Sequence, residues 1–208
     1  QIESEWIFSM SIKVIMIISN RPACGQTTVA VNLASGLSRK GYRVLIGDTG
    51  NNKKLRYWLG IDRQETGTNA AKPLEDKAQA KIFSSRLGID LLQLLLKPED
   101  SATADYSPHL EKLTYDYLLL TPASSEDCQW LSAMADALIV CSDLTAANEL
   151  EELKNLEELW RASRINAGGI DLILPNKINT KEWEHNIEQL SILADYFGYE
   201  HIADPIPT

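Results

Sequence analysis

A short run of small and polar residues, Arg21 to Thr28, stands between an apolar stretch and a helical pattern. It reads Arg-Pro-Ala-Cys-Gly-Gln-Thr-Thr and follows the apolar run Ile12 to Ile18. A helix that opens directly after such a run presents unpaired backbone N–H groups, and its dipole favours an anion. The guanidinium of Arg21 and the hydroxyl of Thr27 add polar groups at the same place. These residues therefore predict a site for a phosphate-type anion.

The elements that must position this run form a strand, loop, helix and second strand. A helical face is predicted by three apolar residues at helical spacing, Val29, Leu33 and Leu37. Gly41 stands where a helix commonly ends. The next apolar run, Val44 to Ile46, leads to Asp48. We therefore expect a βαβ unit whose loop lies at a helix N-terminus.

Apolar runs alternate with helical patterns along the rest of the chain. Further strands are expected at Ile89 to Leu96, Tyr117 to Thr121, Ala137 to Cys141 and Ile170 to Leu174. Helices are expected within 51–60, within 61–85, at His109 to Leu113, at Trp130 to Ala135, at Ala146 to Arg164 and from an N-cap at Thr180 to Phe197. Apolar strands with little alternation indicate a sheet that is covered on both faces. We predict a three-layer α/β/α fold, mostly parallel, with any ligand at the carboxyl ends of the strands.

In these residues the chain resembles the ParA/MinD ATPases, whose deviant P-loop reads Lys-Gly-Gly-x-Gly-Lys-Thr-Thr. The flanking residues VAVNLASGLSRKGYRVLIGD are close to what that family carries after its loop, and YDYLLLTPAS, ADALIVCSD and GIDLILPNK are weaker likenesses. The resemblance covers nearly the whole chain and implies the P-loop NTPase fold. It also implies a set of nucleotide-site residues: Arg21, Cys24, Gly25, Gln26, Thr27, Thr28, Asp48, Asn176 and Lys177.

The resemblance assigns roles to several of these positions. Arg21 aligns with the lysine that reaches a partner's nucleotide across a dimer, and arginine keeps that charge. Thr27 would hold magnesium, and only together with a bound nucleotide, because the chain carries no other metal-ligand pattern. Asn176 and Lys177 align with residues that contact adenine, although a polar turn after a strand is an equally good interpretation of them.

The positions that perform catalysis in the family have changed here. Gln26 replaces the P-loop lysine, a charge on the β- and γ-phosphates. Gly50 replaces the Asp that positions water, and Thr121 replaces the Walker B Asp. Pro22 has no N–H to donate. We interpret the chain as a pseudo-ATPase that uses no catalytic residue and binds ATP or ADP with magnesium weakly or not at all.

Three functions are compatible with this pattern. The first is a non-catalytic ParA/MinD-like domain that positions or scaffolds partners through protein contacts, like the pilus and secretion localisation factors of the CpaE/TadZ group. The second is a working ATPase of the same family, in plasmid, chromosome or cargo partitioning, with Arg21 supplying the missing charge. The third, a small-molecule ligase of the wider P-loop superfamily, ranks last because it needs the P-loop lysine most.

Composition narrows the class of partner. The 208 residues carry a net charge of −9 with a pI near 4.9, which disfavours non-specific DNA binding because that requires a basic surface. Apolar runs are too short for a membrane span. Three widely spaced cysteines favour a reducing cytoplasm. We expect a cytoplasmic, bacterial protein that works through protein partners.

The domain organisation is predicted to be simple. Residues 1–11 form an acidic lead-in that belongs to a linker or is a remnant of an expression vector, and residues 12–208 form one ParA/MinD-like domain. Both ends suggest a piece of a longer polypeptide. The resemblance implies pairing of two copies, and we expect a weak or constitutive homodimer that ATP does not affect.

Three local expectations depend on burial. The helix within 51–60 is expected to pack Trp58 against the sheet. The glutamates of the helix Ala146 to Arg164, including Glu149 and Glu152, are expected to form a solvated face. Cys24 lies at a helix N-terminus, which would lower the pKa of its thiol, although inert packing is the commoner state of a free cysteine.

Overall fold

The computed structural model describes residues 12–50, 52–61, 68–69, 79–95, 114–145, 148–162 and 168–208. Its strands are β1 (Lys13–Ser19), β2 (Val44–Asp48), β3 (Thr68–Asn69), β4 (Gln79–Phe83), β5 (Ile89–Leu95), β6 (Tyr117–Thr121), β7 (Ala137–Ser142), β8 (Leu172–Ile178) and β9 (Ile206–Pro207). Its α-helices are α1 (Gln26–Arg39), α2 (Lys53–Trp58), α5 (Ser125–Leu131), α6 (Glu149–Ala162) and α7 (Trp183–Phe197). The short 3-10 helices η2 (Thr180–Glu182) and η3 (Tyr199–His201) flank α7.

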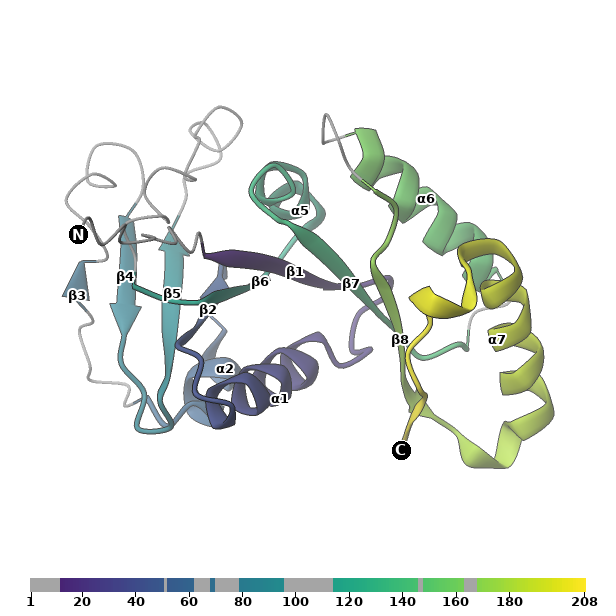
Figure 1. Ribbon diagram of the computed structural model, residues 1–208, viewed down its shortest axis with the longest axis horizontal. Helices are drawn as coiled ribbons and strands as arrows, with labels where there is room; N and C mark the ends of the chain where they lie inside the picture. Colours follow the sequence, from purple (N-terminus) through teal and green to yellow (C-terminus); the bar gives the residue numbers. More distant parts are fainter. Residues whose placement is uncertain are drawn as a thin grey trace, which may run out of the picture.

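The strands form a sheet in the order β3-β4-β5-β2-β6-β1-β7-β8-β9 (Figure 1). β1 pairs in parallel with β6 on one side and with β7 on the other. β2 is also parallel to β6, so β1 and β2 run in the same direction with β6 between them. Among the described strands, two neighbouring pairs are antiparallel: β3 with β4, and β4 with β5. The predicted α/β fold, with its loop at the end of a central strand, is therefore confirmed.

Helices cover both faces of this sheet. α1 and α2 pack on one face, and α5, α6 and α7 pack on the other (Figure 1). Because side chains alternate along a strand, β1 contributes to both cores. Met16 belongs to the α5–α7 side and Ile17 to the α1–α2 side, and both are fully buried. The strand before the loop is thus fixed from above and below.

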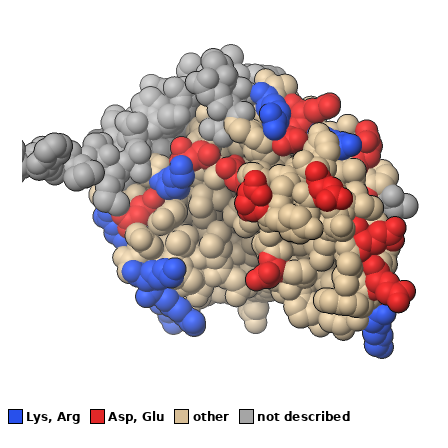
Figure 2. All heavy atoms as spheres, turned by 45° about the vertical axis from the view of Figure 1, so that its right-hand side comes forward, with Lys and Arg blue, Asp and Glu red and all other residues tan. Residues whose placement is uncertain are grey.

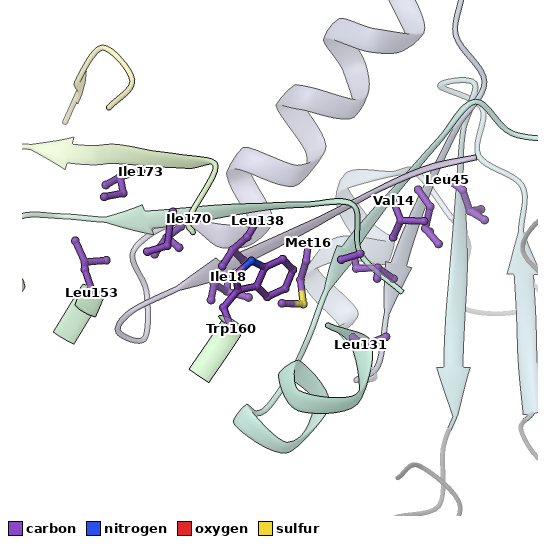
Figure 3. Close-up of a cluster of buried hydrophobic side chains, with 14 of the residues drawn as sticks. Val14, Met16, Ile18, Leu45, Leu131, Leu138, Leu153, Trp160, Ile170 and Ile173 are labelled. Carbon is purple, nitrogen blue, oxygen red and sulfur yellow. The ribbon is translucent and has the colours of Figure 1, made fainter. Parts of the chain in front are cut away.

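The core on the α5–α7 side is built around one large aromatic side chain. Trp160 of α6 lies beside Ile18 and Met16 of β1 (Figure 3). Leu131 and Leu153 bring α5 and α6 into the same cluster. This packing holds α6 over the carboxyl half of β1, which is where the loop begins.

Helix α1 begins and ends as its sequence predicts. Gly25 precedes it with a φ of 98°, and Gly41 follows it with a φ of 91°, a conformation that glycine adopts at little cost. The centre of its buried face is formed by Ala30 and Ala34, while the predicted stripe of Val29, Leu33 and Leu37 flanks that centre and is partly buried. Two alanines at the contact let α1 lie close to the sheet.

The expectation of a loop and one short helix within 61–85 is wrong for the residues described there as strands, while 62–67 and 70–78 lie outside the described residues. Residues 79–83 form β4, which pairs antiparallel with β5, and Thr68–Asn69 forms the edge strand β3. Ala80 and Phe83 are buried. Tertiary pairing with β5 decides the conformation of this charged segment, because a short run of residues has too little periodicity of its own.

Several helix limits also differ from expectation. α5 spans Ser125–Leu131 instead of Trp130 to Ala135, because the Ser124 hydroxyl caps it by accepting from the Asp127 N–H. α6 begins at Glu149. The helix expected from Thr180 is divided into η2 and α7, and Asn179 is the capping side chain. Gly198 ends α7 as predicted. The segment His109 to Leu113 lies outside the described residues.

The short helix after β2 is capped by Asn52, whose side chain accepts from the N–H groups of Lys54 and Leu55. Leu55 and Leu59 are fully buried, whereas Trp58 is half-buried beneath the Lys54 ammonium. Leucines, more than the tryptophan, therefore hold α2 against the sheet. None of the helices in the described part of the chain has the length and apolar character that crossing a bilayer requires.

Candidate functional site

The loop between β1 and α1 lies at the carboxyl end of the central strand. Asn20 leaves β1, and Gly25 immediately precedes the first residue of α1, Gln26. No side chain caps this helix N-terminus. Ala23 has a φ of 69°, a left-handed conformation that is strained for a residue with a Cβ. The backbone bends here much as a glycine-rich loop does, although one bend is made by an alanine.

The Gln26 side chain points back to the sheet. Its amide nitrogen donates to the carbonyl of Ile17 at 2.9 Å and to that of Pro122 at 3.1 Å. An amide has two N–H donors, so both are used. Gln26 therefore joins the end of β1 to the residue that follows β6.

β8 supports the loop from its other side. Asn176 Nδ2 donates to the Cys24 carbonyl at 2.8 Å, and Lys177 Nζ donates to the Ala23 carbonyl at 2.5 Å. A Cβ on Gly25 would collide with Asn176 Nδ2. Both residues were expected just beyond a strand ending at Leu174, but β8 continues to Ile178, so they lie within it. The structure brings these two predicted site residues directly onto the loop.

Arg21 is held by carboxylates of this same chain. Its Nη2 lies 2.6 Å from Asp143 Oδ1 and 2.8 Å from Glu149 Oε2. Its Nε lies 3.4 Å from Glu152 Oε2, and Nη1 donates to the Thr145 hydroxyl at 3.0 Å. Burial opposes ionisation of Asp143, but hydrogen bonds from Thr145 and the Arg21 charge lower its pKa below the ordinary value. One guanidinium thus faces three carboxylates.

Glu149 is the buried member of this acidic group. It is 1% exposed and accepts hydrogen bonds from the Ser142 hydroxyl and, at 2.7 Å, from the Asn20 amide. A solvated position was expected for Glu149, and this was wrong because the first turn of α6 lies against Asn20 and Arg21. The position of Arg21 is fixed by this buried carboxylate.

Asn52 connects the start of α1 to the end of β2. Its Nδ2 donates to the Thr27 hydroxyl at 3.3 Å, and its backbone N–H donates to Asp48 Oδ2 at 3.1 Å. Burial raises the pKa of Asp48 to about 6, and the nearby Asp127 adds to the rise, while N–H groups of Asn52 and Gly50 oppose it. Asp48 and Thr27 therefore share one bridging residue. Thr28, the last predicted loop residue, is exposed on the first turn of α1.

The described residues do not fit a resident metal. Among them no group of three or more His, Cys, Asp or Glu side chains could hold one. At the end of β6 the Thr121 hydroxyl donates to the Gly47 carbonyl at 2.9 Å, so this position has no carboxylate and its polar group is used inside the sheet. A hard cation such as Mg²⁺ needs oxygen ligands. The Thr27 hydroxyl would become one only beside a nucleotide's phosphates.

Cys24 is a packing residue. Its thiol is fully buried and lies 3.7 Å from Asn20 Oδ1. Burial raises the pKa of the Cys24 thiol, and Asp143 adds to the rise. The expectation of inert packing is therefore confirmed, and the alternative of a thiol pKa lowered by the helix N-terminus is wrong, because the side chain belongs to the α1–α2 core.

Comparison with solved structures assigns the fold. A plasmid partition protein from Borrelia burgdorferi B31, bound to AMPPNP, matches with a TM-score of 0.69 and 16% identity, over 94% of this chain and 85% of that one. The chain shares the fold of this protein. A variant of McdA from Cyanothece, in complex with ATP, matches with a TM-score of 0.67 and 18% identity over 95% and 84% of the two chains. Cobyrinic acid a,c-diamide synthase of Mycobacterium smegmatis, with an ATP analogue and magnesium, matches with a TM-score of 0.65 and 17% identity over 94% and 87%. No protein-family model and no curated protein sequence matches the chain.

Within this fold, the sequence alone identified the loop but not the residues that surround it. Asp143, Glu149 and Glu152 surround Arg21, and Asn52 bridges Thr27 to Asp48. The position of Asn52 directly before a helical pattern was an available signal, since asparagine is a preferred N-cap. The carboxylates carried no such signal, because their contact with Arg21 spans more than a hundred residues.

Proposed function

We propose that this chain is a P-loop domain that does not hydrolyse ATP and that acts in subcellular positioning or scaffolding through protein contacts. The observation that carries the proposal is the engagement of Gln26, whose amide bridges the Ile17 and Pro122 carbonyls. In a working P-loop this position supplies a positive charge to the phosphates. In this chain the same position holds an uncharged side chain whose two donors are used in hydrogen bonds within the protein.

The other charges around the loop favour the same proposal. Arg21 forms ion pairs with three carboxylates, those of Asp143, Glu149 and Glu152, so the net charge of this group beside the loop is negative. A charge-assisted hydrogen bond is worth roughly 1.5–3 kcal/mol, and the loop loses this contribution at Gln26 and at Thr121 alike. Such losses are not additive when residues act together. Hydrolysis is therefore expected to be absent or negligible.

The amides at the start of α1 remain a weak anion site. A helix N-terminus favours an anion by roughly 0.3–1 kcal/mol, and by about 2 kcal/mol when partly buried. Pro22 contributes no N–H, and the carboxylates near Arg21 repel a phosphate. We expect nucleotide affinity no tighter than the high-micromolar range, about −5 to −6 kcal/mol.

The positioning role is supported by the fold and by the charge of the chain. Two of the matched structures are a plasmid partition protein and McdA. A net charge of −9 disfavours binding to DNA, which is itself negatively charged, and favours contacts with proteins. We propose a role of the pilus or secretion localisation type, in the cytoplasm of a bacterial cell.

A binding and turnover experiment tests the catalytic half of the proposal. ATP and ADP are titrated with magnesium into the unmodified chain, Gln26→Lys and Thr27→Ala, and phosphate release is measured on the same samples. We expect no release above the Thr27→Ala background and tighter ADP binding by Gln26→Lys, because lysine restores the charge and leaves the backbone amides in place. Unchanged affinity in Gln26→Lys would mean that Pro22 and Ala23 close the loop.

Low-micromolar ATP binding, or turnover well above the Thr27→Ala background, would overturn the proposal in favour of a partitioning ATPase. The positioning half is tested by imaging a fluorescent fusion in the native host. We expect the same localised pattern with and without Thr27→Ala, since nucleotide is not needed. A diffuse signal in both strains would refute a positioning role.

A further inference from the structure

An apolar groove runs between α7 and the chain segment that leads into β9. Its α7 wall is formed by Ile187, Leu190, Ser191 and Ala194, and its other wall by Tyr199 and residues 202–205. The hollow measures about 330 Å³. It lies beside the amino half of β8, where Ile202 bridges to Ile173, whereas the loop contacts the other half of that strand. The groove is therefore separate from the loop.

The groove exposes large apolar side chains to solvent. Ile187 is 47% exposed and Tyr199 is 73% exposed. Trp183, one turn before Ile187 on the same face of α7, is 63% exposed. Apolar side chains gathered in this way mark binding surfaces more often than they mark ordinary surface. A hollow at the low end of small-molecule pocket volumes, bordered by exposed side chains, fits the anchor residues of a docked segment.

Carboxylates border this groove in a regular pattern. The apolar stripe of α7 is Trp183, Ile187, Leu190 and Ala194. The adjoining stripe, one residue further along at each step, is Glu184, Glu188, Ser191 and Asp195. Positions separated by three or four residues share a face of a helix, so three exposed carboxylates follow the groove along α7. Asp204 adds a fourth from the opposite wall.

Figure 2 turns the α6 and α7 side of the molecule forward. Asp and Glu side chains are spread over this side with uncharged surface between them. An apolar hollow bordered by carboxylates complements a segment with apolar anchors and flanking cations. A partner helix laid along α7 would place residues i, i+3, i+4 and i+7 on the apolar stripe. Its lysines or arginines would face the carboxylate stripe. The negative charge of this stripe speeds the encounter with a basic partner and repels an acidic one.

We infer that this groove is a docking site for a basic amphipathic helix of a partner protein. The inference goes beyond the function of the loop, because it holds whether or not the loop binds or hydrolyses nucleotide. Its basis is the joint presence of exposed apolar anchor sites and a one-sided row of carboxylates. An anionic membrane surface is disfavoured by the same carboxylates.

A synthetic peptide is the probe. It has about 14 residues, or roughly four helical turns, with leucine at helical spacing and lysine elsewhere. Its twin carries glutamate in place of lysine, with the same leucines. Calorimetric titration of the whole chain should give a dissociation constant of tens to hundreds of micromolar for the lysine peptide, and affinity at least about tenfold weaker for the twin. Added salt should weaken binding of the lysine peptide, because salt screens the attraction between its lysines and the exposed carboxylates.

Two matched variants locate the binding. Ser191→Arg places a long cation in the groove, and His185→Arg adds the same side chain at an exposed position on the side of α7 away from it. We expect Ser191→Arg to weaken lysine-peptide binding at least about tenfold and His185→Arg to change it less than about twofold. Circular dichroism establishes that both variants are folded.

Three results would overturn the inference. The first is no binding of the lysine peptide at about 1 mM, which would also be the result if another part of the chain covered the groove. The second is equal binding of both peptides, or an equal effect of both variants. The third is another occupant: a dimer in sedimentation that Ser191→Arg abolishes, or binding to phosphatidylglycerol vesicles that Ser191→Arg abolishes.

Discussion

Replacing Asp48 with asparagine should stabilise the folded protein at neutral pH and leave its stability unchanged in acid. Asp48 is only 4% exposed, and burial raises the pKa of its carboxyl from 3.8 to about 6. Asparagine has the same shape and keeps an oxygen that accepts from the Asn52 N–H, a hydrogen bond of 3.1 Å in the native protein. The substitution therefore removes a buried charge with little change in contacts.

The sign follows from where each state holds the proton. Between about pH 4 and pH 6 the folded state retains a proton on Asp48 that the unfolded chain has lost, so stability falls as the pH rises through this window. The difference between 3.8 and about 6 corresponds to about 3 kcal/mol, since one pKa unit is about 1.4 kcal/mol. Asp48→Asn should therefore gain up to about 3 kcal/mol above pH 6 and nothing near pH 4.

Urea unfolding followed by tryptophan fluorescence, at intervals from about pH 4 to pH 8, measures this difference directly. Asp116→Asn is the matched control. Hydrogen bonds from Arg43 hold the pKa of Asp116 below its ordinary value, so its charged form stabilises the protein and its removal should destabilise above about pH 4. An Asp48→Asn protein that is less stable than the native protein at pH 7, or that has the same pH dependence, would refute the reasoning.

Three further predictions concern the loop and the pairing of chains. Ala23→Gly should raise the free energy of unfolding by about 0.5–1 kcal/mol in urea titrations, because Ala23 has a φ of 69°; a loss of stability would contradict this. Gly25→Ala should lower it by roughly 1–3 kcal/mol in the same assay, because Gly25 has a φ of 98° and its Cβ would meet Asn176; an unaltered midpoint would be the contrary result. In sedimentation we expect a weak or constitutive dimer that ATP does not affect, since Arg21 is held by carboxylates of its own chain; a monomer that pairs only when ATP is added would exclude it.

Much of the fold could be predicted from local pattern. The apolar runs of β1 and β2, with the helical spacing and glycines of α1 between them, carry their own signals for strand, helix and helix end. β4 carries none, because Gln79–Phe83 is short and follows a charged run, and only its pairing with β5 makes it a strand. Local propensity is overridden there by a neighbour that the pattern does not reveal.

The candidate site divides in the same way. Its loop was recognisable because the residues Arg21 to Thr28 are contiguous in the sequence. The carboxylates that hold Arg21 were not recognisable. Helical periodicity predicts which residues of α6 share a face, but it does not predict which distant residues the first turn of α6 contacts. Glu149 has the same pattern as its solvated neighbours Glu151 and Glu158, yet it is buried beside Arg21. Only the packing of α6 over β1 separates them.

β8 has a mechanical consequence. One half of this strand holds the loop through Asn176 and Lys177, and the other half supports a groove wall, where the Ala203 N–H donates to Ile173 at 2.9 Å. If one end of a rigid strand is displaced, the other end moves with it, and so do the residues that contact that end. If an anion in the loop changes the affinity of a helix in the groove, the helix must change the affinity of the anion by the same factor. A protein without turnover would then still transmit the occupancy of one site to the other.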